Sequence, residues 1–142
     1  KMNVKKPIAF GNIDTVVRAR HSFFNLLSEV REDEAVVDCF QGSSAAYSYV
    51  KPNNKDELEF VADNIRVSEF ACSGLYGFSS VEFFTREAVG ALKDDETANF
   101  TKVYQRLLNS KFRTLISYSN EGADTLVLGT PEEYIVNLHK VK

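Results

Sequence analysis

The sequence predicts a single α/β domain with a mixed sheet and flanking helices. The chain has 142 residues, 44% of them hydrophobic, which is enough for one real core and short for two. Short apolar and β-branched runs, typical of buried strands, alternate with longer segments of helical periodicity. No internal repeat, low-complexity tract or interdomain linker interrupts them. We therefore expect one domain over residues 1–142.

The first half of the chain indicates strands joined by turns, with one helix. An apolar strand over 7–10 ends in a Gly-Asn turn that carries Asp14, and apolar residues at helical spacing then predict a helix over 16–30. Three later runs are short and either apolar or alternating, as is typical of strands: 35–40, 47–50 and 58–62. The second and third of these runs are expected to form an antiparallel pair around the turn 52–56.

The stretch from Ser68 to Phe78 joins small residues directly to the apolar run Leu-Tyr-Gly-Phe. Small residues allow another backbone or a ligand to come close, and the apolar run after them is typical of a buried strand. We therefore expect a buried strand here with a site of close approach beside it.

The second half alternates helices with strands. A helix is predicted from a cap at Ser79 and Ser80 to about Leu92, and a second, strongly amphipathic one over 100–108. In the last helix Thr130 would be the N-cap, and Pro131 and Glu133 fit the first position and the capping box. The remaining predictions are strands over 112–118 and 125–128 and a turn at 120–122.

Charge and cysteine content restrict the class of protein. Seventeen basic and 20 acidic residues give a net charge of −3 and a pI near 5.4, without a long block of either sign. This balance argues against a dedicated surface for nucleic acid or anionic membranes. No apolar run reaches the ~20 residues of a membrane span, and the start lacks the apolar core of a secretion signal. We expect a soluble, cytoplasmic protein in which Cys39 and Cys72 are buried free thiols.

Few residues carry recognisable chemistry. Asp14 follows a strand and a turn, so its carboxylate is a candidate ligand for a divalent cation that holds phosphate oxygens; the alternative is an ordinary turn residue. The sequence has no hydrolase nucleophile elbow, no triad signature, no Gly-x-Gly-x-x-Gly and no P-loop. The residues alone therefore indicate an α/β domain with one candidate metal carboxylate.

Five segments, in this order along the chain, resemble one family. They are Pro7 to Asp14 (PIAFGNID), Tyr47 to Val50 (YSYV), Ser68 to Phe78 (SEFACSGLYGF), Asn99 to Leu108 (NFTKVYQRLL) and Gly129 to Tyr134 (GTPEEY). Each segment is similar to a motif of the sugar-1-phosphate nucleotidyltransferases, also called sugar-nucleotide pyrophosphorylases. The likeness is greatest to members associated with capsule and lipopolysaccharide synthesis.

The resemblance implies a partial Rossmann-like mixed sheet and a reaction in which a sugar 1-phosphate attacks a nucleoside triphosphate, releasing pyrophosphate. By position, Asp14 would hold Mg²⁺, and the backbone near Ser48 and Cys72 would touch the sugar, with Ser73 in the same pocket. Asp63 stands where the family has a sugar-binding glutamate, and Asn64 where it has a phosphate-binding lysine. This chemistry needs positioning and charge neutralisation more than a protein nucleophile.

The sequence also departs from the family pattern. The family's nucleotide-binding half would lie before Lys1, so the chain looks like the C-terminal part of such an enzyme, active when joined to that half. Asn64 is neutral where the family has a cation, and Val127 occupies the place of a second metal-binding aspartate. The alternatives are a non-catalytic sugar-phosphate-binding or assembly module of the same fold, and an unrelated α/β interaction domain. Formation of a homo-oligomer stays open.

Overall fold

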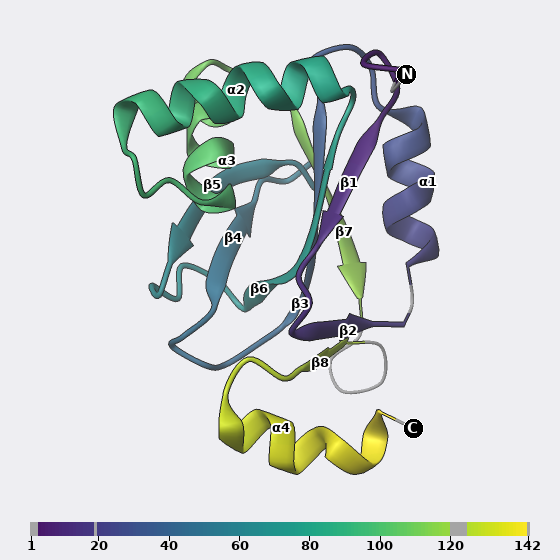
Figure 1. Cartoon of the computed structure of the whole chain (residues 1–142), viewed down its shortest axis with the longest axis vertical. Helices are drawn as coiled ribbons and strands as arrows, with labels where there is room; N and C mark the ends of the chain where they lie inside the picture. The colour runs from purple at the N-terminus through teal and green to yellow at the C-terminus, as the bar shows by residue number, and fades with distance from the viewer. Residues whose placement is uncertain (1–2, 19, 120–124, 142) are drawn as a thin grey trace.

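A mixed six-stranded sheet forms the body of the protein (Figure 1). The computed structural model describes residues 3–18, 20–119 and 125–141. Five strands lie in the order β5, β4, β6, β3, β7, and β1 pairs with β6 alongside them; β3 and β7 are parallel, and the other pairs are antiparallel. The predicted α/β class with a mixed sheet is thus confirmed. The strands are β1 (Ile8–Gly11), β3 (Ala35–Gln41), β4 (Ser48–Pro52), β5 (Leu58–Asp63), β6 (Phe70–Phe78) and β7 (Thr114–Ser119).

A second, two-stranded sheet lies at one end of the body (Figure 1). It pairs β2 (Thr15–Val17) with β8 (Thr125–Val127) in antiparallel register. The predicted helix over 16–30 is therefore wrong in its first turn, because Val16 and Val17 belong to β2 and the helix begins at His21. The two valines fit either state locally, and their pairing with β8, far along the chain, decides for a strand. The turn expected at 120–122 lies outside the described residues.

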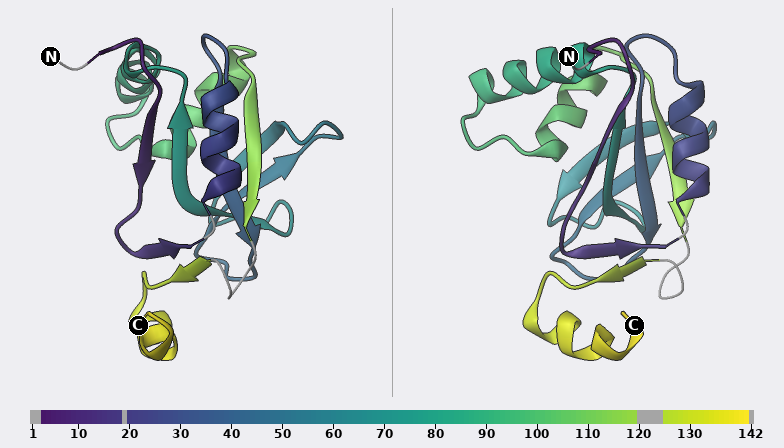
Figure 2. Two further views of the ribbon diagram at one scale, coloured as in Figure 1. Left: turned by 90° about the vertical axis from the view of Figure 1, so that its right-hand side faces the viewer. Right: turned by 45° about the vertical axis from the view of Figure 1, so that its right-hand side comes forward.

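Helices cover both faces of the main sheet (Figure 2). Helix α1 (His21–Glu29) buries Phe23 and Leu27 against one face, while α2 (Val81–Asp94) and α3 (Phe100–Asn109) bury Phe83, Tyr104 and other apolar residues against the other. The cap of α2 is Ser80, whose hydroxyl accepts from the Phe83 amide at 3.0 Å, and not the other predicted serine, Ser79, which lies three residues before Glu82. The sheet is thus the middle layer of three.

Strand β6 is the centre of the sheet and contains the small residues noted in the sequence. Gly74 has φ +85°, a conformation that side chains disfavour, and a Cβ there would lie 2.7 Å from the Asn12 side chain. At Gly77 a Cβ would lie 2.9 Å from Leu27 and 3.0 Å from Phe23 of α1. The close approach at these two glycines is therefore made by the protein itself.

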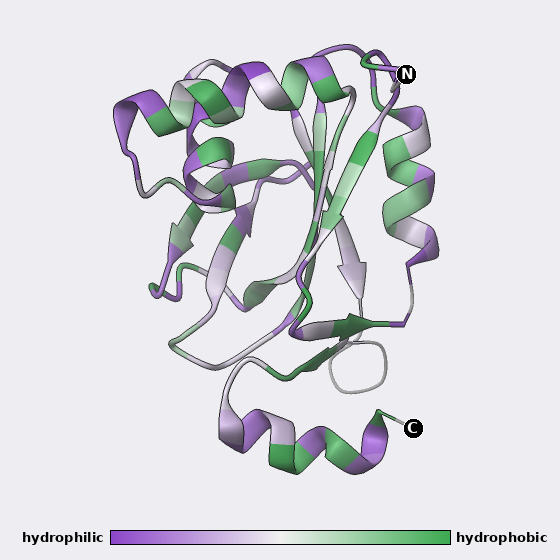
Figure 3. Cartoon of the chain, viewed as in Figure 1, coloured by the Kyte–Doolittle hydropathy of each residue, from purple (hydrophilic) through white to green (hydrophobic). Residues whose placement is uncertain are grey.

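The C-terminal segment extends away from the body (Figures 1 and 2). Helix α4 (Pro131–Asn137) begins with the predicted capping box of Thr130 and Glu133 and leads into a short 3-10 turn, η1 (Leu138–Lys140). Apolar and polar residues alternate along it (Figure 3), and none of its residues is buried; Ile135, for example, is 71% exposed. No helix in the described part of the chain is long and apolar enough to cross a membrane.

Replacing Gly77 by alanine tests the packing of α1 on β6. We expect Gly77→Ala to lower the free energy of unfolding by about 1–3 kcal/mol, because the new methyl group overpacks the contact with Leu27 and Phe23. Gly11→Ala is the matched control in β1, where a Cβ would make only an ordinary contact, 3.9 Å from Leu75; its effect should stay within about 0.5 kcal/mol. Equal denaturant midpoints for the two variants would contradict this packing.

Candidate functional site

A polar cavity of about 160 Å³ lies where the small sheet meets the large one. Its walls come from the β1–β2 turn, the start of β4, the middle of β6 and the end of β8. This volume is smaller than that of most drug-sized sites, so it suits a compact polar ligand. The lining residues are Asn12, Asp14, Thr15, Ala46, Tyr47, Ser48, Cys72, Tyr76 and Val127.

Three of the six residues predicted as a site line this cavity: Asp14, Ser48 and Cys72. A fourth, Asp63, bonds directly to Ser48. These residues come from four separate segments, so only the fold brings them together. The alternative hypothesis of an unrelated α/β interaction domain gives no reason for these residues to converge.

Asp14 presents an exposed carboxylate at the cavity. Its backbone oxygen accepts from the Leu128 amide at 2.7 Å, which fixes the residue beside β8. Within the described residues, its side chain accepts one long contact, at 3.4 Å, from the Thr15 hydroxyl. Beside it, a Cβ at Gly129 would lie 3.1 Å from Asp14 Oδ2 and 3.8 Å from Glu133 Oε2, so a side chain at this position would crowd the Asp14 carboxylate. The glycine thus leaves the Asp14 carboxylate accessible.

This donor set fits Mg²⁺ held mainly by a substrate. Magnesium is commonly bound through one or two carboxylates, with water and phosphate oxygens completing its octahedron. Among the described residues, no group of three or more His, Cys, Asp or Glu side chains is arranged around a metal position. The residues present therefore suit a weakly held, substrate-completed cation rather than a closed protein cage.

Glu133 connects α4 to the cavity wall that contains Tyr47. Its Oε1 accepts a hydrogen bond from the Tyr47 hydroxyl at 2.7 Å, and its Oε2 accepts from the Thr130 amide at 3.0 Å within the capping box. Tyr47 precedes β4 and Glu133 belongs to α4, so this bond ties the C-terminal helix to the large sheet. Sequence reasoning identified Glu133 only as a cap, because its second partner lies 86 residues away.

Ser48 and Asp63 form one hydrogen-bonded unit behind the cavity. Asp63 accepts from the Ser48 hydroxyl at 2.5 Å, from Thr101 at 2.5 Å and from the Asn99 amide at 2.8 Å. Burial opposes ionisation of Asp63, but these hydrogen bonds outweigh it and hold the pKa of the carboxyl below its usual value. Three of the roughly four acceptor positions of the Asp63 carboxylate are therefore already taken by protein donors.

Asn64 does not line the cavity. It follows β5 with φ +55°, and its amide donates to the Tyr47 carbonyl at 3.1 Å, while its side chain is exposed. Asparagine is one of the few residues with a side chain that adopt this left-handed conformation readily. The left-handed backbone thus gives a local reason for an asparagine at position 64.

Ser73 lies on the opposite face of β6 from Cys72, as the two-residue period of a strand requires. Its hydroxyl donates to Asp38 at 2.5 Å, Ser117 donates to the other oxygen, and all three side chains are buried. Burial raises the pKa of the Asp38 carboxyl, and hydrogen bonds from Ser117 and Ser73 offset only part of this effect. The Ser73 side chain is therefore absent from the lining of the cavity, and its role in binding stays a prediction.

Cys72 and Tyr76 form the β6 wall. Cys72 lies opposite Cys39 in the register of β6 and β3; both thiols are free, as predicted, with Cys39 buried and Cys72 partly buried. Burial raises the pKa of Cys72 to about 12 and that of the Tyr76 hydroxyl far above its usual value. Both groups are therefore neutral near pH 7, so they shape the cavity without contributing charge.

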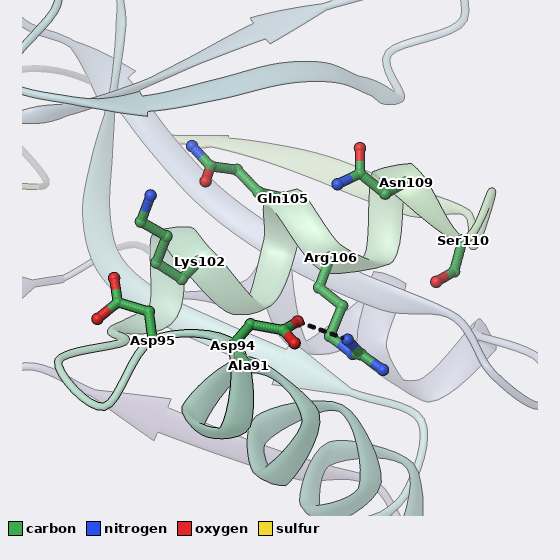
Figure 4. Close-up of a pocket in the computed structure, with 8 residues that line it drawn as sticks. All are labelled: Ala91, Asp94, Asp95, Lys102, Gln105, Arg106, Asn109 and Ser110. Carbon is green, nitrogen blue, oxygen red and sulfur yellow. Dashed lines mark hydrogen bonds and ion pairs between the residues drawn. The ribbon is translucent and has the colours of Figure 1, made fainter.

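A second hollow, of about 380 Å³, lies between α2 and α3 (Figure 4). Two of its lining charges pair with each other, since Arg106 bonds Asp94 at 2.9 Å, and Arg106 also bonds the buried Glu87 at 3.2 Å. No residue predicted as a site lines it. We therefore interpret it as an ion-paired seam between two helices.

Removing the Tyr47 hydroxyl should loosen α4. We expect Tyr47→Phe to speed hydrogen exchange of the amides over 132–138 about fivefold, because one hydrogen bond contributes about 1 kcal/mol. Tyr118→Phe is the matched control, since it deletes a phenol whose hydrogen bond goes to Asp56, at 2.9 Å, instead of to α4. If exchange is unchanged in Tyr47→Phe, the bond to Glu133 does not hold the helix.

The buried Asp38 should make stability depend on pH. Because its folded-state pKa is raised above the value of 3.8, its contribution to stability is complete below that pH and is lost as pH rises through the folded pKa. The stability of Asp38→Asn relative to the unchanged protein should therefore increase from pH 4 to pH 8. The gain in relative free energy of unfolding is about 1.4 kcal/mol for each unit by which the folded-state pKa of Asp38 is raised, and denaturant unfolding measures it. A difference that stays flat with pH would contradict this.

Comparison with known proteins identifies the fold. No protein-family model matches the sequence, and no curated protein sequence does. Among solved structures, the chain resembles a nucleoside-diphosphate-sugar pyrophosphorylase from Vibrio cholerae RC9, with a TM-score of 0.75 and 19% identity over 97% of this chain and 58% of that one. It also resembles an inositol-1-phosphate CTP transferase from T. maritima, with a TM-score of 0.71 and 14% identity over 96% of this chain and 54% of that one. The chain therefore has the fold of these nucleotidyltransferases and spans a little over half of their length.

Proposed function

We propose that this chain is the sugar-phosphate-binding part of a nucleotidyltransferase that makes a nucleoside-diphosphate sugar. The observation that carries the proposal is the convergence of Asp14, Ser48 and Cys72 on one polar cavity. Two further facts support it: the fold is that of a nucleoside-diphosphate-sugar pyrophosphorylase and of an inositol-1-phosphate CTP transferase, and five segments resemble motifs of the sugar-1-phosphate nucleotidyltransferases. The likeness of those segments to the capsule and lipopolysaccharide branch favours a cytoplasmic role in polysaccharide biosynthesis.

In the proposed reaction an oxygen of the sugar 1-phosphate attacks the α-phosphorus of a nucleoside triphosphate. A P–O bond forms to the sugar phosphate, the bond to the β-phosphate breaks, and pyrophosphate leaves. Mg²⁺ supplies charge neutralisation when bound. The chain's own residues bind and orient: Asp14 faces the phosphates, while Ser48 and the β6 wall hold the sugar ring.

One observation favours the alternative of a non-catalytic module. Val127 lines the cavity and lies opposite Thr15 in the β2–β8 register, beside Asp14. An apolar side chain there leaves the cation with one fewer carboxylate than the family pattern has. A module that binds sugar phosphates without transferring nucleotides would keep the cavity and tolerate this valine.

Asp14→Asn tests the proposal in the natural polypeptide that contains these residues. With Mg²⁺, nucleoside triphosphates and a panel of sugar 1-phosphates, we expect pyrophosphate release from the unchanged protein and a loss of about 100-fold or more in the variant. The amide keeps the shape but removes the charge that faces the cation, an effect of several kcal/mol in phosphoryl-transfer sites. Glu29→Gln makes the same charge change at the end of α1 away from β2 and should keep full activity.

Two results separate the hypotheses. A folded natural polypeptide that binds sugar 1-phosphates but releases no pyrophosphate with any nucleotide would favour the non-catalytic module. A folded polypeptide that neither binds nor reacts would reject both.

A further inference from the structure

We infer that Ser48 selects for a ring hydroxyl that donates a hydrogen bond, because Asp63 holds the serine proton on the protein side of the cavity. The inference rests on the proposed function, since it takes the occupant to be a sugar phosphate. It changes the expected role of Asp63 from a sugar contact to a positioning residue. Specificity then comes from the direction of one hydrogen bond.

The geometry directs the hydroxyl proton of Ser48 to Asp63. Its hydroxyl oxygen lies 2.5 Å from Asp63 Oδ1, and an ionised carboxylate can only accept, so Ser48 must be the donor. Thr101 donates to the same carboxylate oxygen at 2.5 Å. The Thr101 oxygen is also 3.5 Å from that of Ser48, but its single proton already has the nearer acceptor.

The oxygen of Ser48 is left with acceptor capacity toward the cavity. A hydroxyl has one proton and two lone pairs, and Ser48 lines the cavity beside Cys72 and Tyr76. Donation to a carboxylate also polarises the hydroxyl and strengthens it as an acceptor. A ligand group placed against Ser48 must therefore bring its own proton, as a sugar hydroxyl does.

Residues at the start of α3 hold the Asp63 carboxylate in its orientation. Asn99 caps α3, accepting from the Lys102 amide at 3.2 Å, and donates its own amide to Asp63 Oδ2 at 2.8 Å. Thr101 is the second residue of α3 and is buried. The carboxylate thus has protein donors on both oxygens, and the start of α3 sets the orientation of Ser48.

Fluorinated sugars test the direction of this bond, because fluorine does not donate. Binding of glucose 1-phosphate and galactose 1-phosphate, with Mg²⁺, is measured by calorimetry alongside their monodeoxy and monodeoxyfluoro analogues. At one ring position we expect fluorine and hydrogen to weaken binding equally, by about 5- to 10-fold. In Ser48→Ala that loss should fall to within about twofold, because the acceptor is gone.

Asp63→Asn distinguishes positioning from a merely structural role. The amide no longer requires the Ser48 proton, so Ser48 can turn its proton to the ligand, and the fluoro analogue should regain affinity relative to the deoxy analogue. Thr101→Val is the matched control: it removes the other hydroxyl on the same carboxylate oxygen, and the fluoro-to-deoxy ratio should stay that of the unchanged protein. General destabilisation would weaken all ligands together and leave the ratio unaltered.

The outcomes separate this inference from the proposed function. If sugar phosphates bind the unchanged protein, and the deoxy and fluoro analogues lose as much affinity in Ser48→Ala as in the unchanged protein, the role of Ser48 is overturned. The proposed function would then still stand. A fluoro analogue that binds the unchanged protein as well as the parent sugar would overturn the donor requirement. Absence of binding by every sugar phosphate would overturn the proposed function and this inference together.

Discussion

The hydrogen bonding of β6 is the constraint on which the rest of the structure depends. One edge of this strand pairs with β3 along nearly its whole length, while its first residues pair with β4 and its last with β1. The change of partner occurs near Gly74, whose left-handed φ accompanies the irregular register of β3 between Val37 and Cys39. Because β1 and β4 are both anchored to β6, the turn after β1 and the start of β4 meet at one cavity.

Two carboxylates illustrate how this sheet separates environments. Asp63 stands on the cavity side among three donors, and its pKa is lowered because hydrogen bonding outweighs burial. Asp38 stands under α1, fully buried, and its pKa is raised because burial outweighs its serine partners. Neighbouring residues of β6 face these two environments: Ser73 donates to Asp38 on one face of the sheet, while Cys72 lines the cavity on the other. The polar cavity that gathers the predicted site residues lies on the Asp63 side of the sheet.

Elements with strong local signals could be predicted from the sequence. Helix α3 follows from its apolar spacing, and the capping box of α4 from Thr130, Pro131 and Glu133, because these interactions span one or two turns. The start of α1 could not, since Val16 and Val17 are stabilised as a strand by β8. The same limit applies to the site: resemblance pointed to Asp14, Ser48 and Cys72, but no local pattern distinguishes Cys72, in the wall, from Ser73 behind it.

By itself the sequence determined the class of fold, most of its elements and a set of candidate residues, because hydrophobic period, turns and caps are short-range properties. The tertiary structure decided how those residues are used. It placed Asn64 outside the cavity, joined Tyr47 to Glu133 and surrounded Asp63 with donors from Ser48 and α3. These are contacts between distant segments, and their geometry depends on strand pairing and helix packing, which no short stretch of sequence encodes.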